Sequence, residues 1–181
     1  MKNSLLRLST IALLLTPLFF LSGCSKLRSI TLHKTYSDID FTIPAPQTAG
    51  TFELDKVINA DLQSLAASYG FDISKIESAS INSISLIISD TNAVPVTFSI
   101  VDSASCSFSA DGVTVVDVGS DDAVHTSPTQ LDFDLKGIDV SPYLKATTFH
   151  AKMRLTTHAP ISHDVPMKAS IQCTFKVTPF K

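Results

Sequence analysis

The sequence has no tryptophan, little charge and no surplus of basic residues, and the charge pattern excludes two classes of protein. Only 17% of its 181 residues are charged, whereas 44% are hydrophobic and the mean hydropathy is +0.25. A disordered chain would carry more charge and fewer large apolar residues. The 14 basic residues are outnumbered by 17 acidic ones, so the basic surplus typical of nucleic-acid binding is missing. The composition therefore indicates a folded, mildly acidic protein with one domain's worth of chain.

The common sequence signatures of enzymes are also missing. The chain has no Gly-x-Ser-x-Gly elbow, His-Glu-x-x-His helix, glycine-rich phosphate loop or Cys-x-x-Cys pair. Distant residues can still assemble a catalytic triad, so this absence lowers the expectation of an enzyme without excluding one. His158, His163 and Asp164 lie near one another, but their spacing is not a recognised metal-ligand pattern. We therefore predict no catalytic residues, no metal site and no cofactor.

The first 23 residues have the organisation of a secretory signal peptide. Lys2 and Arg7 give a positive start, and a mainly apolar run of 14 residues follows from Leu8 to Leu21. A membrane-spanning helix needs about 20 residues, whereas signal peptides have shorter apolar regions of this kind. Pro17 and the small residues after the run also argue against the alternative, a retained transmembrane anchor. We therefore expect residues 1–23 to be a targeting segment.

The end of this segment, Leu21-Ser22-Gly23-Cys24, resembles the lipobox of bacterial lipoproteins. The resemblance covers only the first 24 residues and leaves the family of the mature domain unassigned. It implies cleavage before Cys24, a diacylglycerol on the Cys24 thiol and often an acyl chain such as palmitate on the new amino group. Each buried CH₂ contributes about 0.8 kcal/mol, so two or three chains make attachment effectively permanent. Ser25 replaces the aspartate that signals inner-membrane retention in many Gram-negative bacteria, which favours the outer membrane.

Removal of residues 1–23 leaves 158 residues, with 12 basic and 17 acidic side chains and a formal charge of −5. This mature chain lacks the clustered Lys/Arg face that binds nucleic acid or anionic headgroups. We expect residues 24–27 to be the lipidated anchor with a short linker, and residues 28–181 to form a single domain. The chain would then bind the membrane through the lipid on Cys24.

Two cysteines remain in the mature chain, Cys106 and Cys173. Both lie on the apolar phase of alternating segments, so both side chains should point into the core. An exported protein lives where disulfides persist, and a bridge between them would close a 67-residue loop worth about 4 kcal/mol. The alternative is two free buried thiols that act as small apolar side chains. The sequence thus favours a Cys106–Cys173 disulfide and leaves free thiols open.

A two-residue hydrophobic period, typical of strands, dominates the mature chain. Ile81 is out of phase with Ile84, which predicts a bulge near residues 82–83. Asp111-Gly112 is a strong hairpin signal. The segments with this alternation are 39–43, 49–54, 76–88, 94–100, 104–110, 113–115, 131–135, 149–155 and 165–177.

Other segments have different patterns. Apolar residues at three- and four-residue spacing predict one helix over residues 55–69, which Gly70 would end. Residues 119–128 form a predicted polar loop, and residues 141–144 a helical turn. Seven to nine antiparallel strands and one short helix predict a mainly β fold, an antiparallel β-sandwich of the Ig-like or jelly-roll type. A closed barrel is the main alternative.

These features together favour a membrane-anchored envelope lipoprotein with a non-catalytic role, either structural or as a protein-interaction module. One alternative is the binding of a lipid or another small apolar ligand between the sheets. A less favoured one is an envelope hydrolase that uses scattered aspartates and histidines. The sequence itself identifies no protein partner.

Overall fold

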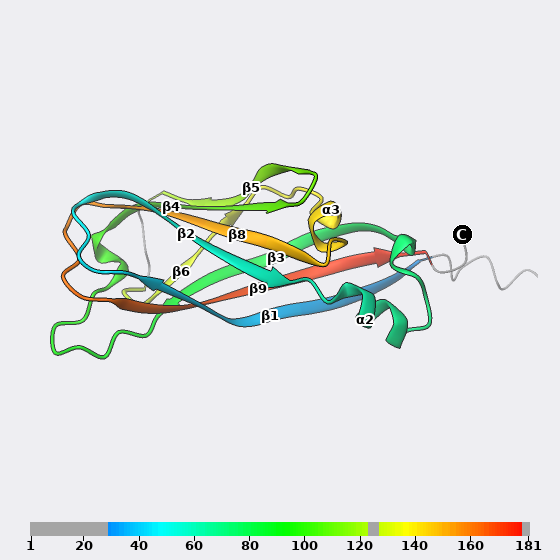
Figure 1. Cartoon of the computed structure of the whole chain (residues 1–181), viewed down its shortest axis with the longest axis horizontal. Coiled ribbons are helices and arrows are strands. Elements are labelled where there is room, and N and C mark those ends of the chain that lie inside the picture. Colours follow the sequence, from blue (N-terminus) through cyan, green and yellow to red (C-terminus); the bar gives the residue numbers. More distant parts are fainter. Residues whose placement is uncertain (1–28, 123–126, 179–181) are drawn as a thin grey trace, which may run out of the picture.

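Two antiparallel sheets pack face to face in the computed structural model, which describes residues 29–122 and 127–178 (Figure 1). The first sheet has the strand order β1-β9-β3-β6 and the second has the order β2-β8-β4-β5-β7. Among the described residues no strand pairing joins the two sheets, so the predicted sandwich forms and the barrel alternative does not. The strands are β1 (Ile30–Ile43), β2 (Gly50–Asn59), β3 (Ile76–Ile88), β4 (Val101–Ala110), β5 (Val113–Asp121), β6 (Gln130–Asp132), β7 (Asp134–Leu135), β8 (Thr148–Thr157) and β9 (Val165–Val177).

Strand β9 is an inner strand of the first sheet. It pairs with β1 on one side and β3 on the other. Its seven inward positions are all buried, as the sequence predicts: Val165, Met167, Ala169, Ile171, Cys173, Phe175 and Val177. Strand β8 has the same position within the second sheet, between β2 and β4, and buries Phe149, Ala151, Met153 and Leu155.

The predicted irregularity in the third strand is confirmed. The pairing of β3 with β9 shifts register between Ile81 and Ser83. An extra residue in one strand turns the next side chains over, so Ile84 and Leu86 return to the core while Ile81 is only partly buried. The Asp111-Gly112 hairpin between β4 and β5 also forms, with Gly112 at φ +73°.

Aromatic rings fill the space between the sheets. Phe149 of β8 packs 5.0 Å from Phe108 of β4 and 5.7 Å from Tyr36 of β1, measured between ring centroids. The Tyr36 hydroxyl donates a 2.7 Å hydrogen bond to the Ala60 carbonyl, which satisfies its polar end inside the core. Burial raises the pKa of Tyr36 far above its usual range. These contacts tie strands of both sheets into one core.

The predicted helix over residues 55–69 is shorter than expected. Strand β2 continues to Asn59, and the helix α2 comprises only Leu62–Ser68. Leu54 and Ile58 are both buried, and their four-residue spacing fits either one helical turn or two strand repeats. The predicted helical turn at 141–144 forms as α3 (Ser141–Leu144).

The predicted strand at residues 94–100 is wrong. The segment is a loop followed by the 3₁₀ helix η3 (Phe98–Ile100). Phe98 is fully buried, but Val94 is 82% exposed, so the alternation here does not reflect a buried strand face. Pro95 also lacks the N–H that a strand ladder needs.

Residues 119–122 and 127–135 differ from the predicted polar loop and single strand, and residues 123–126 of that loop lie outside the described residues. Strand β5 runs through Gly119 to Asp121, and the following alternating segment forms two short strands in different sheets. Leu131 of β6 lies opposite Leu86 in the first sheet, whereas Asp134 of β7 lies opposite Ser120 in the second. The chain therefore crosses from the first sheet to the second at Phe133. A Cβ at Gly119 would lie 3.1 Å from the Phe133 Cβ, so the absence of a side chain at Gly119 leaves room for this crossing.

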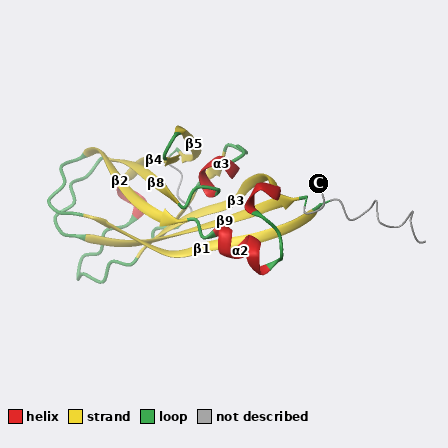
Figure 2. Cartoon of the chain, turned by 45° about the vertical axis from the view of Figure 1, so that its right-hand side comes forward, coloured by secondary structure: helices red, strands yellow, loops and turns green. Residues whose placement is uncertain are grey.

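The start of the first described strand and the end of the last lie side by side at one end of the sandwich. Ile30 of β1 lies opposite Val177 of β9, and α2 with the 3₁₀ helix η2 (Ile73–Lys75) connects β2 to β3 at the same end (Figures 1 and 2). We call this the anchor end, because the described chain begins here, shortly after Cys24, the residue at which the sequence predicts a lipid anchor. None of the helices within residues 29–122 and 127–178 has the length and apolarity needed to cross a membrane.

Candidate functional site: the charged face of the second sheet

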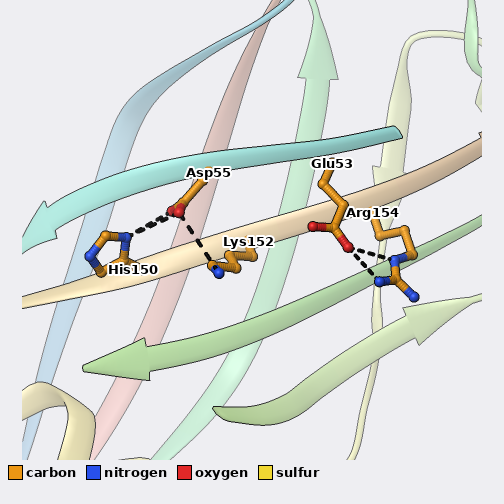
Figure 3. Close-up of polar contacts among 5 residues, drawn as sticks. All are labelled: Glu53, Asp55, His150, Lys152 and Arg154. Atoms are coloured by element: carbon orange, nitrogen blue, oxygen red, sulfur yellow. Dashed lines mark hydrogen bonds and ion pairs between the residues drawn. The ribbon is translucent and has the colours of Figure 1, made fainter. Parts of the chain in front are cut away.

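Charged side chains from two paired strands line the outer surface of the five-stranded sheet (Figure 3). They are Glu53 and Asp55 of β2, and His150, Lys152 and Arg154 of β8; we call these five residues the charged face. Leu54 of β2 and the alternate residues of β8 are buried, because successive side chains of a strand alternate between the two faces. The register places Glu53 opposite Arg154 and Asp55 opposite Lys152. Each acidic side chain of β2 therefore has a basic partner on β8.

The acidic and basic groups form ion pairs across the strands. Arg154 donates from Nε to Glu53 Oε1 at 3.0 Å, and its Nη2 donates to the same oxygen. Asp55 accepts from His150 Nδ1 at 2.9 Å and lies 4.0 Å from Lys152 Nζ (Figure 3). The hydrogen bond from Arg154 to Glu53 raises the pKa of the guanidinium above its usual value. The charged face thus presents both signs in a fixed order.

A shallow hollow of about 290 Å³ lies beside these pairs, over β8, β4 and β5. Hydroxyls from β4 and a carboxylate from β5 complete its polar wall, and Val115 contributes an apolar patch. The hollow therefore offers positive and negative side chains together with hydroxyl groups, which can form hydrogen bonds with a polar protein surface. The polar residues that line it are Glu53, Ser105, Ser107, Asp117, Lys152 and Arg154.

Three histidines form pairs with aspartates, which is the arrangement that a hydrolase would require. His150 pairs with Asp55, His158 Nδ1 lies 2.7 Å from Asp102, and His163 Nε2 lies 2.7 Å from Asp90. In a Ser-His-Asp triad the histidine also holds a nucleophile on its other nitrogen.

No such nucleophile is well placed among the described residues. The only hydroxyl that contacts one of these paired imidazoles in that part of the chain is Ser162, 3.5 Å from His163 Nδ1. That distance is too long for an effective hydrogen bond from a hydroxyl. Ser109 lies opposite His150 in the strand register, but no hydrogen bond joins the two side chains in the described structure. The described residues therefore provide histidine–aspartate pairs without a closely bonded hydroxyl nucleophile.

The three residues weighed as metal ligands are separated by the fold. His158 turns to Asp102 and His163 to Asp90, while Asp164 accepts a 2.7 Å hydrogen bond from the backbone N–H of Ala45. Across residues 29–122 and 127–178, no group of three or more His, Cys, Asp or Glu side chains is arranged to hold a metal ion.

The predicted disulfide is corrected by the structure, in which Cys106 and Cys173 are free and buried thiols. Cys106 belongs to β4 of the second sheet and Cys173 to β9 of the first. Alternation correctly places both side chains in the core, but it does not determine their relative positions along the strands. Burial raises the pKa of each thiol to about 12. The remaining cysteine, Cys24, lies outside the described residues.

The predicted alternation over residues 149–155 is consistent with an outward face for His150, Lys152 and Arg154, but it does not identify their partners. Glu53 and Asp55 are separated from them by about a hundred residues, and their segment was assigned partly to a helix. Correct assignment of β2 as an alternating strand would have placed both carboxylates on one face. The pairing itself depends on the β2–β8 register, which no local pattern encodes.

No protein-family model matches the chain, and no curated protein sequence does. Fold and surface together define the class: an antiparallel β-sandwich with a polar, mixed-charge sheet face. Among solved structures, this chain is similar to a capsid structure of Helicobacter pylori bacteriophage KHP30, with a sequence identity of 13% and a TM-score of 0.35. The match covers 82% of this chain and 98% of that chain. A structure of infectious bursal disease virus Gx strain shares 14% identity over 84% of this chain and 33% of that one, with a TM-score of 0.40. Likeness at this level carries no argument about function.

Proposed function

We propose that the chain is an envelope lipoprotein, anchored through lipid on Cys24, whose β-sandwich is a non-catalytic protein-interaction or structural module. The lipobox-like Leu21–Cys24 segment supports the anchor, and Ser25 supports an outer-membrane destination. The meeting of Ile30 and Val177 at one end supports a tethered geometry, because it leaves the outer faces of both sheets free of the tether.

The charged face is the surface that we assign to the protein partner, and its pattern of ion pairs is the observation that carries the proposal. The acidic groups lie along β2 and the basic groups along the neighbouring β8, so a partner with the complementary order gains favourable contacts while a mismatched partner meets like charges. A face of this kind selects by pattern, whereas a face of one sign attracts many polyions alike.

The packing of the core favours this function over the binding of an apolar ligand between the sheets. Phe108 and Phe149, from neighbouring strands of the second sheet, are fully buried and in ring contact, and Tyr36 of the first sheet packs on Phe149. A ligand between the sheets would have to displace rings that already fill that space. Native mass spectrometry of the purified protein tests the ligand alternative, which predicts a co-purified lipid.

Site-specific photo-crosslinking in the native envelope tests the interaction surface. Val57 of β2 lies opposite His150 on the second sheet, and Ile87 of β3 is on the first sheet; both are exposed hydrophobic residues. A photoreactive residue at position 57 should yield a defined protein adduct, whereas one at position 87 should not. Identical adducts from both positions, or none from position 57, would contradict the proposal.

The matched charge control uses the Glu53–Arg154 pair. The double substitution Glu53→Arg and Arg154→Glu retains an ion pair but reverses its order. Recognition by charge pattern predicts loss of the position-57 adduct in this variant while the protein remains folded. An undiminished adduct would show that the partner does not read the charged face.

A further inference from the structure

The anchor end is built by the segment between β2 and β3. The backbone N–H of Thr178 donates to the Lys75 carbonyl at 2.9 Å, which holds η2 against the end of β9. Lys34 of β1 lies 3.4 Å from the Asp61 carboxylate, immediately before α2. These contacts keep α2 and η2 beside the start of β1 and the end of β9, as Figures 1 and 2 show.

Two aromatic side chains lie between α2 and η2 at this end. Tyr69 is 59% exposed, and Phe71 is partly buried against the core. Their rings stack with centroids 6.4 Å apart and planes 29° from parallel. A single exposed hydrophobic residue is ordinary, but a stacked aromatic pair on a helix-ending turn is a defined apolar surface.

The backbone turn that carries this pair is fixed. The N–H of Gly70 donates to the Ala67 carbonyl at 3.0 Å, and the N–H of Phe71 donates to the Ala66 carbonyl at 3.1 Å. These are the two hydrogen bonds of a Schellman motif, in which Gly70 takes the left-handed conformation at φ +75°. Tyr69 and Phe71 therefore keep one relative arrangement, and burial of their rings would require little ordering of the backbone.

Lysines match part of the acidic charge around the pair. Asp61 is matched by Lys34, and Glu77 at the start of β3 lies 3.4 Å from Lys176. The Asp72 carboxylate accepts from the backbone N–H of Ser74 at 2.8 Å. The acidic surplus of the chain is thus partly neutralised at this end.

We propose that Tyr69 and Phe71 insert into the interfacial layer of the bilayer to which Cys24 is anchored, and so fix the orientation of the sandwich. This inference rests on the proposed lipidation of Cys24. The six residue-to-residue steps from Cys24 to Ile30 span at most about 22 Å when fully extended. The anchor end is therefore held close to the headgroups, where amphipathic aromatic rings are favoured. The outer edges of both sheets then stand away from the lipid, with the charged face open to a partner.

A single-tryptophan reporter tests this orientation, because the chain has no tryptophan of its own. The variant Tyr69→Trp is purified from membranes in its mature form and reconstituted into phosphatidylethanolamine/phosphatidylglycerol vesicles. Val94→Trp is the matched control, since Val94 is exposed in the loop after β3, at the opposite end of the sandwich. Thermal unfolding confirms that both variants are folded, and mass spectrometry of the same samples shows whether Cys24 carries lipid.

The proposal predicts that brominated lipids quench the Tyr69→Trp reporter and that aqueous iodide quenches it severalfold less than the Val94→Trp reporter. Adding Phe71→Ser to the Tyr69→Trp variant should weaken the lipid quenching. Lipidated samples in which iodide quenches both reporters equally, with no quenching by bromolipid, would overturn the inference while leaving the anchor intact. Samples without lipid on Cys24 would overturn the anchor and this inference together.

Discussion

The Asp90 carboxylate accepts a 2.7 Å hydrogen bond from His163 Nε2, which joins the loop after β3 to the loop before β9. The Asp90 side chain has no exposed surface, and it also accepts from the backbone N–H of Val96 at 2.7 Å and of Asn92 at 3.0 Å. One buried carboxylate therefore joins two loops at the end of the sandwich opposite α2.

Asp90→Asn should reduce stability and flatten its dependence on acid pH. The hydrogen bond from His163 and those from Val96 and Asn92 hold the pKa of Asp90 well below its usual 3.8. A lowered folded-state pKa stabilises the fold above the ordinary value, and this contribution is lost as the pH falls below it. Urea unfolding between pH 7 and pH 2.5 measures the effect. Equal pH profiles for the variant and the parent would show that Asp90 contributes nothing.

Cys106 and Cys173 should resist alkylation in the folded protein. With pKa values raised to about 12 by burial, almost no thiolate exists at pH 8, and the thiols are inaccessible. Denaturation without a reductant should then give iodoacetamide adducts on both residues, identified by peptide mapping. Labelling that requires a reductant would instead demonstrate a disulfide.

Phe149→Ala should destabilise the protein by about 3–5 kcal/mol, because it removes a fully buried ring that contacts Phe108 and Tyr36. Val57→Ala is the control, since its exposed side chain predicts a change within about 0.5 kcal/mol. Chemical denaturation measures both free energies of unfolding. A small effect at Phe149 would mean that the sheets can close over the cavity.

Gly119→Ala should cost about 1–3 kcal/mol through overpacking. Its added Cβ would lie 3.1 Å from the Phe133 Cβ and 3.2 Å from the Asp134 carbonyl oxygen, where the chain crosses between sheets. Val115→Ala on the same strand is exposed and provides the comparison. Equal unfolding midpoints for the two variants would indicate that β6 and β7 shift without cost.

The strands with one buried face were predictable because burial itself creates the two-residue period, as in β8, β9 and the bulge after Ile81. The start of α2 was not, because Leu54 and Ile58 satisfy both periods. The crossing at Phe133 was also hidden, since alternation continues while the chain changes sheets. A two-residue period reports which face is buried but not which sheet buries it.

The charged face and the state of the cysteines depend on long-range register. Arg154 meets Glu53 across 101 residues, so neither residue's own neighbourhood identifies the pair. For Cys106 and Cys173, alternation predicts that each side chain points into the core, but it does not predict how far apart the two residues lie. Pairing between distant residues requires knowledge of which strands lie side by side.

The lipid anchor is the central claim, and intact-mass and peptide analysis of the chain purified from bacterial membranes tests it most directly. We expect that the mature protein begins at Cys24, that residues 1–23 are absent, and that the first residue carries a diacylglycerol together with an amide-linked acyl chain. A mature chain that begins elsewhere, or a Cys24 without lipid, would contradict it.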